Sequence, residues 1–197
     1  MSVRYAWEFD DPERPTPGDV ALLERFLNTI DEHTFGQHAT KPPERRDLFR
    51  TPADLRQWLA EQDLIDDHTE FTDHDLQRAR RLRAGLREWL RDRQDLAADN
   101  EALDAAMGIC RTLRLHVDLD PLRLAPSATG IDAALARVVG QIPIAQASGT
   151  LARLKICAAD DCRFVYYDHS RSRTSRWCST DVCGNRIKTR RYRRRHS

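Results

Sequence analysis

The sequence predicts a mainly α protein, with a helical N-terminal domain that includes a short β-hairpin (residues 1–150) and a small C-terminal zinc module (residues 151–197). Three observations lead to this fold class. Apolar residues recur at helical spacing over much of the first 150 residues, four cysteines fall close together near the C-terminus, and charge divides sharply between the two parts. In the C-terminal part we expect a turn that carries two cysteines (a knuckle), a hairpin, a second knuckle and a helix. This order is typical of a treble-clef-like or zinc-ribbon-like module.

Helical patterns dominate the N-terminal part. The first helix is expected over about residues 19–33, where apolar residues, Leu23 among them, recur at helical spacing and fall on one face. Thr51 and Thr72 each stand three residues before an aspartate, so both predict the start of a helix. A further helix is expected over about residues 100–114. Residues 35–50 have no apolar period, which indicates an exposed loop.

The end of this part changes pattern. Apolar and polar residues alternate over residues 115–124, which favours a short hairpin even though Pro121 interrupts it. Helical spacing returns from Gly130 to Ser148. Because proline lacks a backbone donor, we expect that helix to bend or break near Pro143.

Composition limits the class of protein. The chain has 197 residues, 40% of them hydrophobic, which suits one globular domain with a smaller appendage. There is no apolar run long enough to span a bilayer, and the first residues lack the features of a signal peptide. We therefore expect a cytoplasmic protein that does not bind membranes. Cysteines stay reduced in that compartment, so they favour metal or catalytic chemistry over disulfides.

Four of the cysteines form two C-x4-C pairs, Cys157 with Cys162 and Cys178 with Cys183, separated by fifteen residues. Two tight turns that each present two thiolates suit one tetrahedral zinc ion, and a shell closed by four cysteines indicates structural rather than catalytic zinc. The alternative is four unrelated cysteines that happen to be paired. We expect chelation to unfold the residues after 150 and to leave the N-terminal part folded. Cys110 lies on an apolar helical face and is expected to be a small core residue.

Charge points to a polyanionic partner for the last quarter of the chain. Residues 151–197 carry 13 Lys and Arg against 4 Asp and Glu, whereas residues 1–150 carry 19 against 27. The terminal residues can form a basic helix, which would bind phosphates. A solvated, poorly ordered tail is the alternative for the arginine run. The candidate nucleic-acid-binding residues are Arg163, Arg171, Arg173, Arg176, Asn185, Arg186, Lys188, Arg190, Arg191, Arg193 and Arg194.

The residues from Cys157 to Lys188 resemble a known family. The two cysteine pairs, the segment Ser175-Arg176-Trp177-Cys178 and the tetrapeptide Cys183-Gly184-Asn185-Arg186 are similar to the CGNR-type zinc finger. Such fingers end bacterial proteins of the ABATE type, described as candidate stress-induced transcription regulators. The resemblance implies that the four cysteines bind zinc, that Asn185, Arg186 and Lys188 belong to the signature, and that the finger binds DNA. It also implies a ligand for the helical domain and a location at the bacterial nucleoid.

The N-terminal part resembles that family more loosely. Leu27-Asn28-Thr29-Ile30 is similar to its Asn-Thr element, but Arg25-Phe26 precedes it where Asp-Phe is expected. The resemblance makes Asn28 a candidate ligand-binding residue. The helical spacing alone places Asn28 opposite the apolar face of Leu23, which favours a solvent-facing residue unless a second layer covers it. The histidines, His33 among them, show no metal-binding spacing and are expected at the surface.

Several functions stay open at this point. The leading hypothesis is a transcription regulator that binds DNA through the zinc module and uses the helical domain as a sensor of a small-molecule effector or as a dimerisation unit. An RNA- or ribosome-associated protein is the first alternative, since aromatic residues in the module could stack on bases. The second is a protein-interaction module whose arginines pair with the acidic part of a neighbouring chain in a homodimer. We do not expect an enzyme, because the sequence shows neither an open metal site nor a nucleophile with its base.

Overall fold

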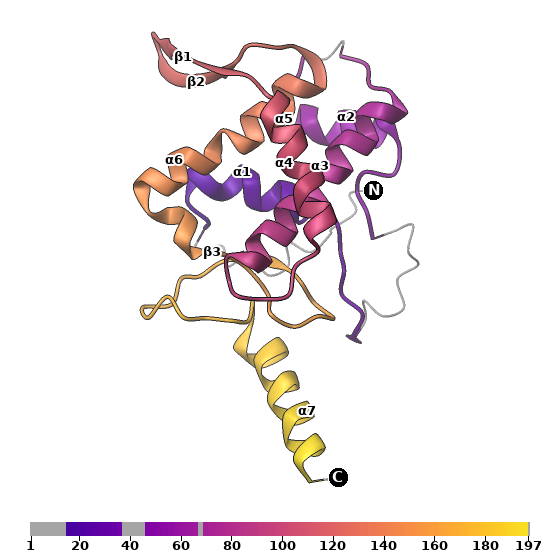
Figure 1. Ribbon diagram of the computed structural model, residues 1–197, viewed down its shortest axis with the longest axis vertical. Coiled ribbons are helices and arrows are strands. Elements are labelled where there is room, and N and C mark those ends of the chain that lie inside the picture. The colour runs from indigo at the N-terminus through magenta and orange to yellow at the C-terminus, as the bar shows by residue number, and fades with distance from the viewer. Residues whose placement is uncertain (1–14, 37–45, 67–68, 197) are drawn as a thin grey trace.

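The computed structural model describes residues 15–36, 46–66 and 69–196 (Figure 1). The helical body contains a two-stranded sheet, and a cysteine-rich segment follows it. The elements of the body are α1 (Gly18–Leu27), α2 (Pro52–Glu61), α3 (Asp73–Asp92), α4 (Asn100–Thr112), β1 (Leu115–Leu119), β2 (Leu122–Pro126), α5 (Gly130–Val139) and α6 (Gln141–Ser148). The C-terminal elements are the 3-10 turn η4 (Thr150–Arg153), β3 (Leu154–Ile156), β4 (Val165–Tyr167), the π-type turn η5 (Thr180–Gly184) and α7 (Asn185–Arg195).

The helix starts expected at Thr51 and Thr72 are confirmed. Each threonine side chain accepts a hydrogen bond from the backbone N–H of the aspartate three residues on, and that aspartate accepts one from the threonine N–H in return. These reciprocal bonds satisfy backbone donors that the first turn of a helix leaves unpaired. α4 is also close to its expected range and is capped by Asp99.

The first helix is shorter than expected. It ends at Leu27, because Thr29 donates its hydroxyl hydrogen back to the carbonyl of Phe26 and Ile30 then forms an isolated β-bridge with Asp47. The expectation of an exposed loop over residues 35–50 is wrong at Phe49, which is fully buried, while residues 37–45 lie outside the described residues. Phe49 packs against Phe26 and Trp58, with ring centroids 5.9 and 5.5 Å away.

α3 and α4 lie side by side in Figure 1 and approach closely at Gly85. A Cβ at this position would stand 2.2 Å from the carbonyl oxygen of Ala102 and 2.3 Å from the Cβ of Ala106. Only glycine allows the two backbones to come so near, which explains a poor helix former in the middle of a 20-residue helix. Cys110 on α4 is half-buried against the core, as expected.

The hairpin is confirmed. β1 and β2 pair antiparallel with Leu119 opposite Leu122, so that Pro121 lies in the turn and needs no ladder hydrogen bond. The next helical segment breaks at Gly140, three residues before Pro143, which confirms the break expected near this proline. Pro143 falls in the first turn of α6, where a missing backbone donor costs nothing.

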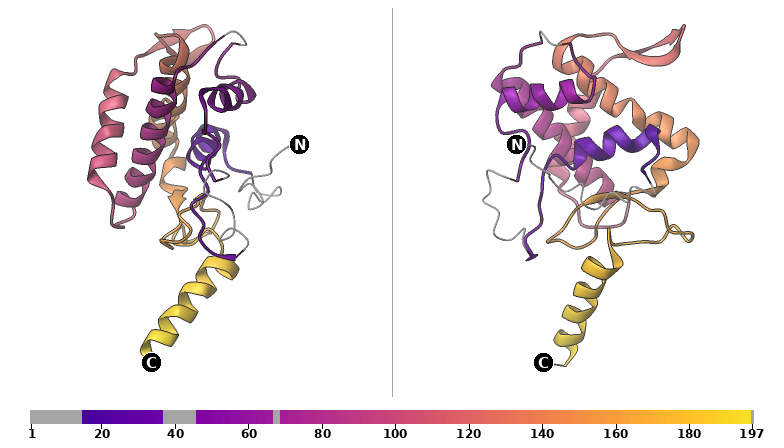
Figure 2. Two further views of the ribbon diagram at one scale, coloured as in Figure 1. Left: turned by 90° about the vertical axis from the view of Figure 1, so that its right-hand side faces the viewer. Right: turned by 180° about the vertical axis from the view of Figure 1, so that it is seen from behind.

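The C-terminal segment packs directly under the body. β3 and β4 form an antiparallel pair, and Leu154, Ile156 and Val165 lie in the same apolar core as the helices. α7 leaves this sheet through the last cysteine pair and extends away from the rest of the molecule in every view (Figures 1 and 2). The fold class is therefore as predicted, a mainly helical body with one hairpin and a four-cysteine module that carries a helix.

Candidate metal centre and arginine-rich surface

The four predicted cysteines converge on one point. The Sγ atoms of Cys157, Cys162, Cys178 and Cys183 all lie within 4.8 Å of one another, and two of the separations are 3.6 and 3.7 Å. Four Zn–S bonds of about 2.3 Å in a tetrahedron place the sulfur atoms about 3.8 Å apart. The cysteines thus fit one zinc ion, and four thiolates complete its shell as in a structural site.

The sulfur atoms are too close to ionise independently. Hydrogen bonding with Cys157 raises the pKa of the Cys162 thiol, whereas hydrogen bonds from Cys157 and its other sulfur neighbours lower the pKa of Cys183. The Arg186 guanidinium lies 3.6 Å from the Cys183 sulfur and also favours its thiolate. A divalent cation compensates the repulsion among the thiolates, which is why this donor set favours a metal.

Aromatic side chains surround the centre. Phe164 and Tyr166 are buried with three of the cysteines, and Trp177 and Phe35 pack against this cluster. Phe35 comes from the body, and the Arg186 guanidinium lies 3.5 Å from the centroid of its ring. The apolar shell limits the access of water to the sulfur atoms.

His33 reaches the metal centre from the body, contrary to the expectation that it lies at the surface. Its ring is buried, with Nε2 3.2 Å from the Sγ of Cys162 and Nδ1 2.6 Å from a carboxylate oxygen of Asp31. The ring thus lies against one of the four cysteines, where it can orient that ligand. The spacing Asp31-x-His33 is the one sequence signal that could have indicated this pair.

Asn28 is buried, so the expectation of a solvent-facing residue is wrong. Its amide nitrogen donates to the carbonyl of Val165 at 2.7 Å, and its amide oxygen accepts from the N–H of Val165 at 2.9 Å. The second layer that covers this face is β4 of the cysteine-rich module. The ligand-binding role of Asn28 stays a prediction. Its two hydrogen bonds to Val165 show that the amide connects the module to the body.

Arg163, a predicted nucleic-acid contact, points into the body. Its guanidinium forms ion pairs with Glu32, at 2.9 Å, and with Glu88. Its carbonyl accepts a 2.7 Å hydrogen bond from the fully buried Arg87, which also donates to Glu32 and to the carbonyl of Leu27. One alternative expected arginines of the module to pair with the acidic part of a neighbouring chain. Arg163 instead pairs with acidic residues of its own chain.

Buried arginines of α3 are a feature that the sequence analysis missed. Arg83, Arg87 and Arg91 are spaced four residues apart and all have less than a tenth of their surface exposed. Arg83 forms a two-pronged ion pair with Asp47, and Arg91 reaches Asp160 in the module at 3.4 Å. Their spacing is visible in the sequence, but arginine at helical spacing ordinarily marks a solvated face.

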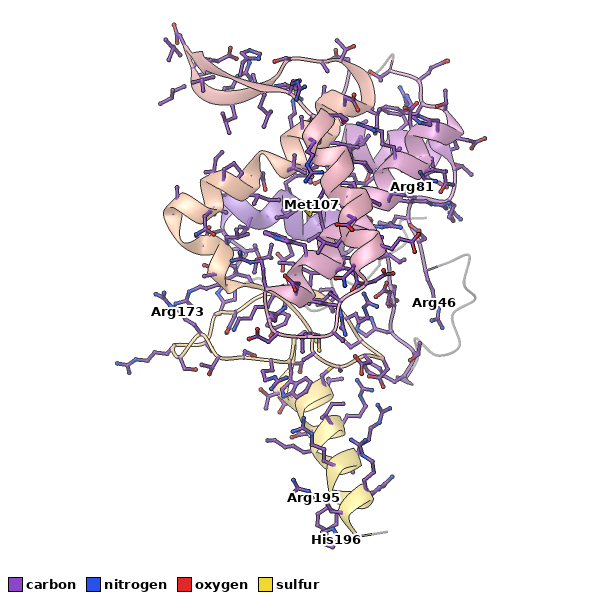
Figure 3. The ribbon with its side chains drawn as sticks, in the orientation of Figure 1. Arg46, Arg81, Met107, Arg173, Arg195 and His196 are labelled. Carbon is purple, nitrogen blue, oxygen red and sulfur yellow. The ribbon has the colours of Figure 1, made fainter. Side chains whose placement is uncertain are left out.

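The remaining predicted contacts separate into a loop and a helix. In the loop after β4, Arg171, Arg173 and Arg176 are exposed, and Figure 3 shows Arg173 pointing outward from its edge. On α7, Arg186 is half-buried and pairs with Asp161, which Arg190 also contacts at 2.7 Å. The exposed α7 candidates are Asn185, Lys188, Arg190, Arg191, Arg193 and Arg194.

A groove runs between α7 and the first cysteine knuckle. It has a volume of about 580 Å³, with Ala158, Trp177 and Ile187 as its apolar lining and arginines of α7 beside them. Asp160 and Asp161 line it as well. The groove thus offers an aromatic surface beside cationic groups.

The fold and the site together define a helical domain joined to a structural-zinc finger that presents a basic helix. Two family models match this chain. The model described as "Putative stress-induced transcription regulator" (ABATE) matches residues 18–159, and that of the CGNR zinc finger matches residues 153–196. The chain belongs to the ABATE family and ends in a CGNR zinc finger.

No curated protein sequence matches it. Within the described residues, the helices lack the combination of length and apolar character needed to cross a bilayer.

Proposed function

We propose that the protein is a transcription regulator that binds duplex DNA through α7 and the exposed arginines of the preceding loop. The helical body serves as its sensor or dimerisation unit. One observation carries this proposal. α7 has seven basic side chains among eleven residues, includes no buried residue and extends away from the body.

The charge of α7 favours a polyanion as its partner. Like charges three and four residues apart destabilise an isolated helix, and α7 compensates only part of this repulsion through Asp161. The phosphates of a duplex would neutralise exposed basic side chains such as Lys188 and Arg191 and release their counterions. A helix of this width also fits the major groove of B-DNA.

We also propose that the protein is not an enzyme. Four cysteines complete the zinc shell, which leaves no position for a reactive water molecule. The ion then stabilises the fold and fixes the start of α7, because Cys183 lies in η5 only two residues before the helix begins at Asn185. A role in DNA binding would place the protein at the nucleoid.

Salt dependence of DNA binding tests the proposal. If the module contacts about five phosphates, the logarithm of the binding constant falls with the logarithm of salt concentration at a slope of roughly −4 to −5. Fluorescence anisotropy of a labelled duplex, with the zinc-loaded full-length protein, measures this slope. Arg191→Ala should make the slope less steep by about 1, whereas Arg111→Ala on the exposed surface of α4 should leave it unchanged. Absence of duplex binding at low salt would exclude the proposal.

An RNA-binding function is the second candidate, and the groove beside α7 favours it. Trp177 lines that groove next to arginines, an arrangement in which an unpaired base can stack while its phosphate is neutralised. Competition between duplex DNA and single-stranded RNA of equal length separates the two candidates. Stronger competition by the RNA, lost in Trp177→Ala, would favour RNA.

A further inference from the structure

The side chains of α7 are not distributed evenly around the helix. At about 100° per residue, Asn185, Thr189, Tyr192 and His196 fall within an arc of about 60°, which we call the polar strip. All four are exposed, and this arc contains none of the seven basic side chains. His196 follows the last residue of the helix, but its ring stacks on Tyr192 with centroids 4.1 Å apart, so it stays on the same face.

The polar strip lies opposite the face that docks α7 onto the module. Ile187, about 170° away from the centre of the strip, packs against the cysteine cluster. Arg186 and Arg190 pair with Asp161 on that side of the helix. The polar strip is consequently the face of α7 most accessible to a large partner.

Basic residues flank the polar strip on both sides. Lys188 and Arg195 lie along one edge, and Arg193 lies along the other. Figure 3 shows Arg195 and His196 together near the free end of α7. A helix in the major groove needs this arrangement, because its central face meets base edges while its flanks approach the phosphates of the two strands.

The arrangement differs from that of a merely solvated helix. A helix that only faces water ordinarily mixes charged and polar side chains over its exposed surface. On α7 the outermost face is uncharged and offers an amide, a hydroxyl, a phenol and an imidazole. The Thr189 hydroxyl donates to the carbonyl of Asn185, and Nδ1 of His196 lies 2.9 Å from the carbonyl of Tyr192. The Asn185 amide and the Tyr192 hydroxyl are therefore the groups of the strip most open to a partner, and an asparagine amide can bond adenine at two positions at once.

We propose that the polar strip reads base edges in the major groove of duplex DNA and gives the protein its sequence specificity. This inference rests on the proposed function. The arginines bind the phosphates of any duplex, and the polar strip adds the contacts that depend on base sequence. A helix of eleven residues is about 16 Å long and covers roughly five base pairs. The recognised element for one copy of α7 should therefore be about that long.

Selection from a random duplex pool provides the test. The zinc-loaded full-length protein is incubated with the pool, bound duplexes are amplified, and affinities are measured for an enriched and a scrambled duplex. We expect the wild type to prefer the enriched duplex, and Asn185→Ala and Tyr192→Ala each to reduce this preference by about 5-fold or more, the range of one good base contact. Affinity for the scrambled duplex and its salt slope should not change.

A flanking residue provides the matched control. Lys188→Ala should weaken binding to both duplexes equally and make the salt slope less steep, because it removes a phosphate contact. If the wild type binds duplexes but enriches no sequence, or if the strip variants keep the full preference, the inference is overturned while the proposed function stands. Uniform weakening by the strip variants would also overturn it, as would preferential binding of double-stranded RNA. No binding of any duplex would instead exclude the proposed function.

Discussion

The side-chain amide of Asn28 forms two hydrogen bonds with the backbone of Val165, one through its nitrogen and one through its oxygen. This pair joins the end of α1 to β4, across 137 residues of sequence. Arg87 and Glu32 extend the same contact to Arg163, and His33 extends it to a zinc ligand. The body and the finger are therefore connected by buried polar groups, whose geometry is more specific than that of apolar packing.

Asn28→Ala should destabilise the protein by about 2–4 kcal/mol, because it leaves the buried N–H and C=O of Val165 without their partner. Urea unfolding of the zinc-loaded protein measures this change. Asn100→Ala, at an exposed position of α4, should change the free energy of unfolding by less than about 0.5 kcal/mol. If Asn28→Ala lowers the free energy of unfolding no more than Asn100→Ala does, the amide of Asn28 does not hold the finger on the body.

His33→Ala should weaken zinc binding by about 10- to 100-fold, the usual effect of removing a group that hydrogen-bonds a metal ligand. Competition with a chromogenic chelator measures the affinity. The matched control is His74→Ala, since His74 is exposed in the first turn of α3. Equal affinities of the two variants would mean that the contact between His33 and Cys162 does not support the metal.

Glu32 should make stability depend on pH in a defined direction. Burial alone would raise its pKa, but attraction to Arg87 and Arg163 lowers the pKa below the ordinary value of 4.5. A carboxyl with a depressed pKa in the folded state stabilises the protein above its unfolded-state pKa, and this contribution is lost as the pH falls through the folded-state pKa.

The replacement Glu32→Gln should thus cost about 1–3 kcal/mol at neutral pH, the range for hydrogen bonds to a charged group. The difference from wild type should shrink as the pH falls below about 4.5. Urea unfolding at a series of pH values measures it, with Glu70→Gln, an exposed replacement, as the control. A constant difference at all pH values would contradict the assignment.

Local sequence signals predicted the elements that depend on local chemistry. The capping threonines, the hairpin and the four cysteines each use neighbours close in the chain, so their patterns are visible without the fold. The contacts of Asn28, His33 and Arg87 could not be predicted in this way. Each is a polar residue whose partner lies more than 50 residues away, and polar residues on a helix or in a loop are ordinarily solvated.

Chelation should disrupt a smaller region than the sequence alone indicates. Leu154, Ile156 and Val165 belong to the core of the body, whereas the cysteines form a cluster of their own with Trp177 and Ile187. Removing zinc should therefore loosen the two knuckles and α7 and leave β3 and β4 in place. Amide hydrogen exchange should show lost protection over residues 177–195 and retained protection at Ile156 and Val165. Loss at all of these positions would show that the whole segment after residue 150 depends on the metal.

Two glycines of the α3–α4 pair should respond oppositely to the same replacement. Gly85→Ala places a Cβ against the backbone of Ala102 and the side chain of Ala106, so the helices must separate and stability should fall by about 1–3 kcal/mol or more. Gly108 lies in α4, and a Cβ added there would have no atom within 4 Å. Gly108→Ala should therefore raise stability by about 0.5–1 kcal/mol through a higher helix propensity.

Thermal unfolding of the two glycine variants compares them directly. Because the replacement is identical, helix propensity favours alanine at both positions, and a lower stability of Gly85→Ala can come only from the close approach of the two helices. An equal gain in both variants would show that α3 and α4 do not touch at Gly85.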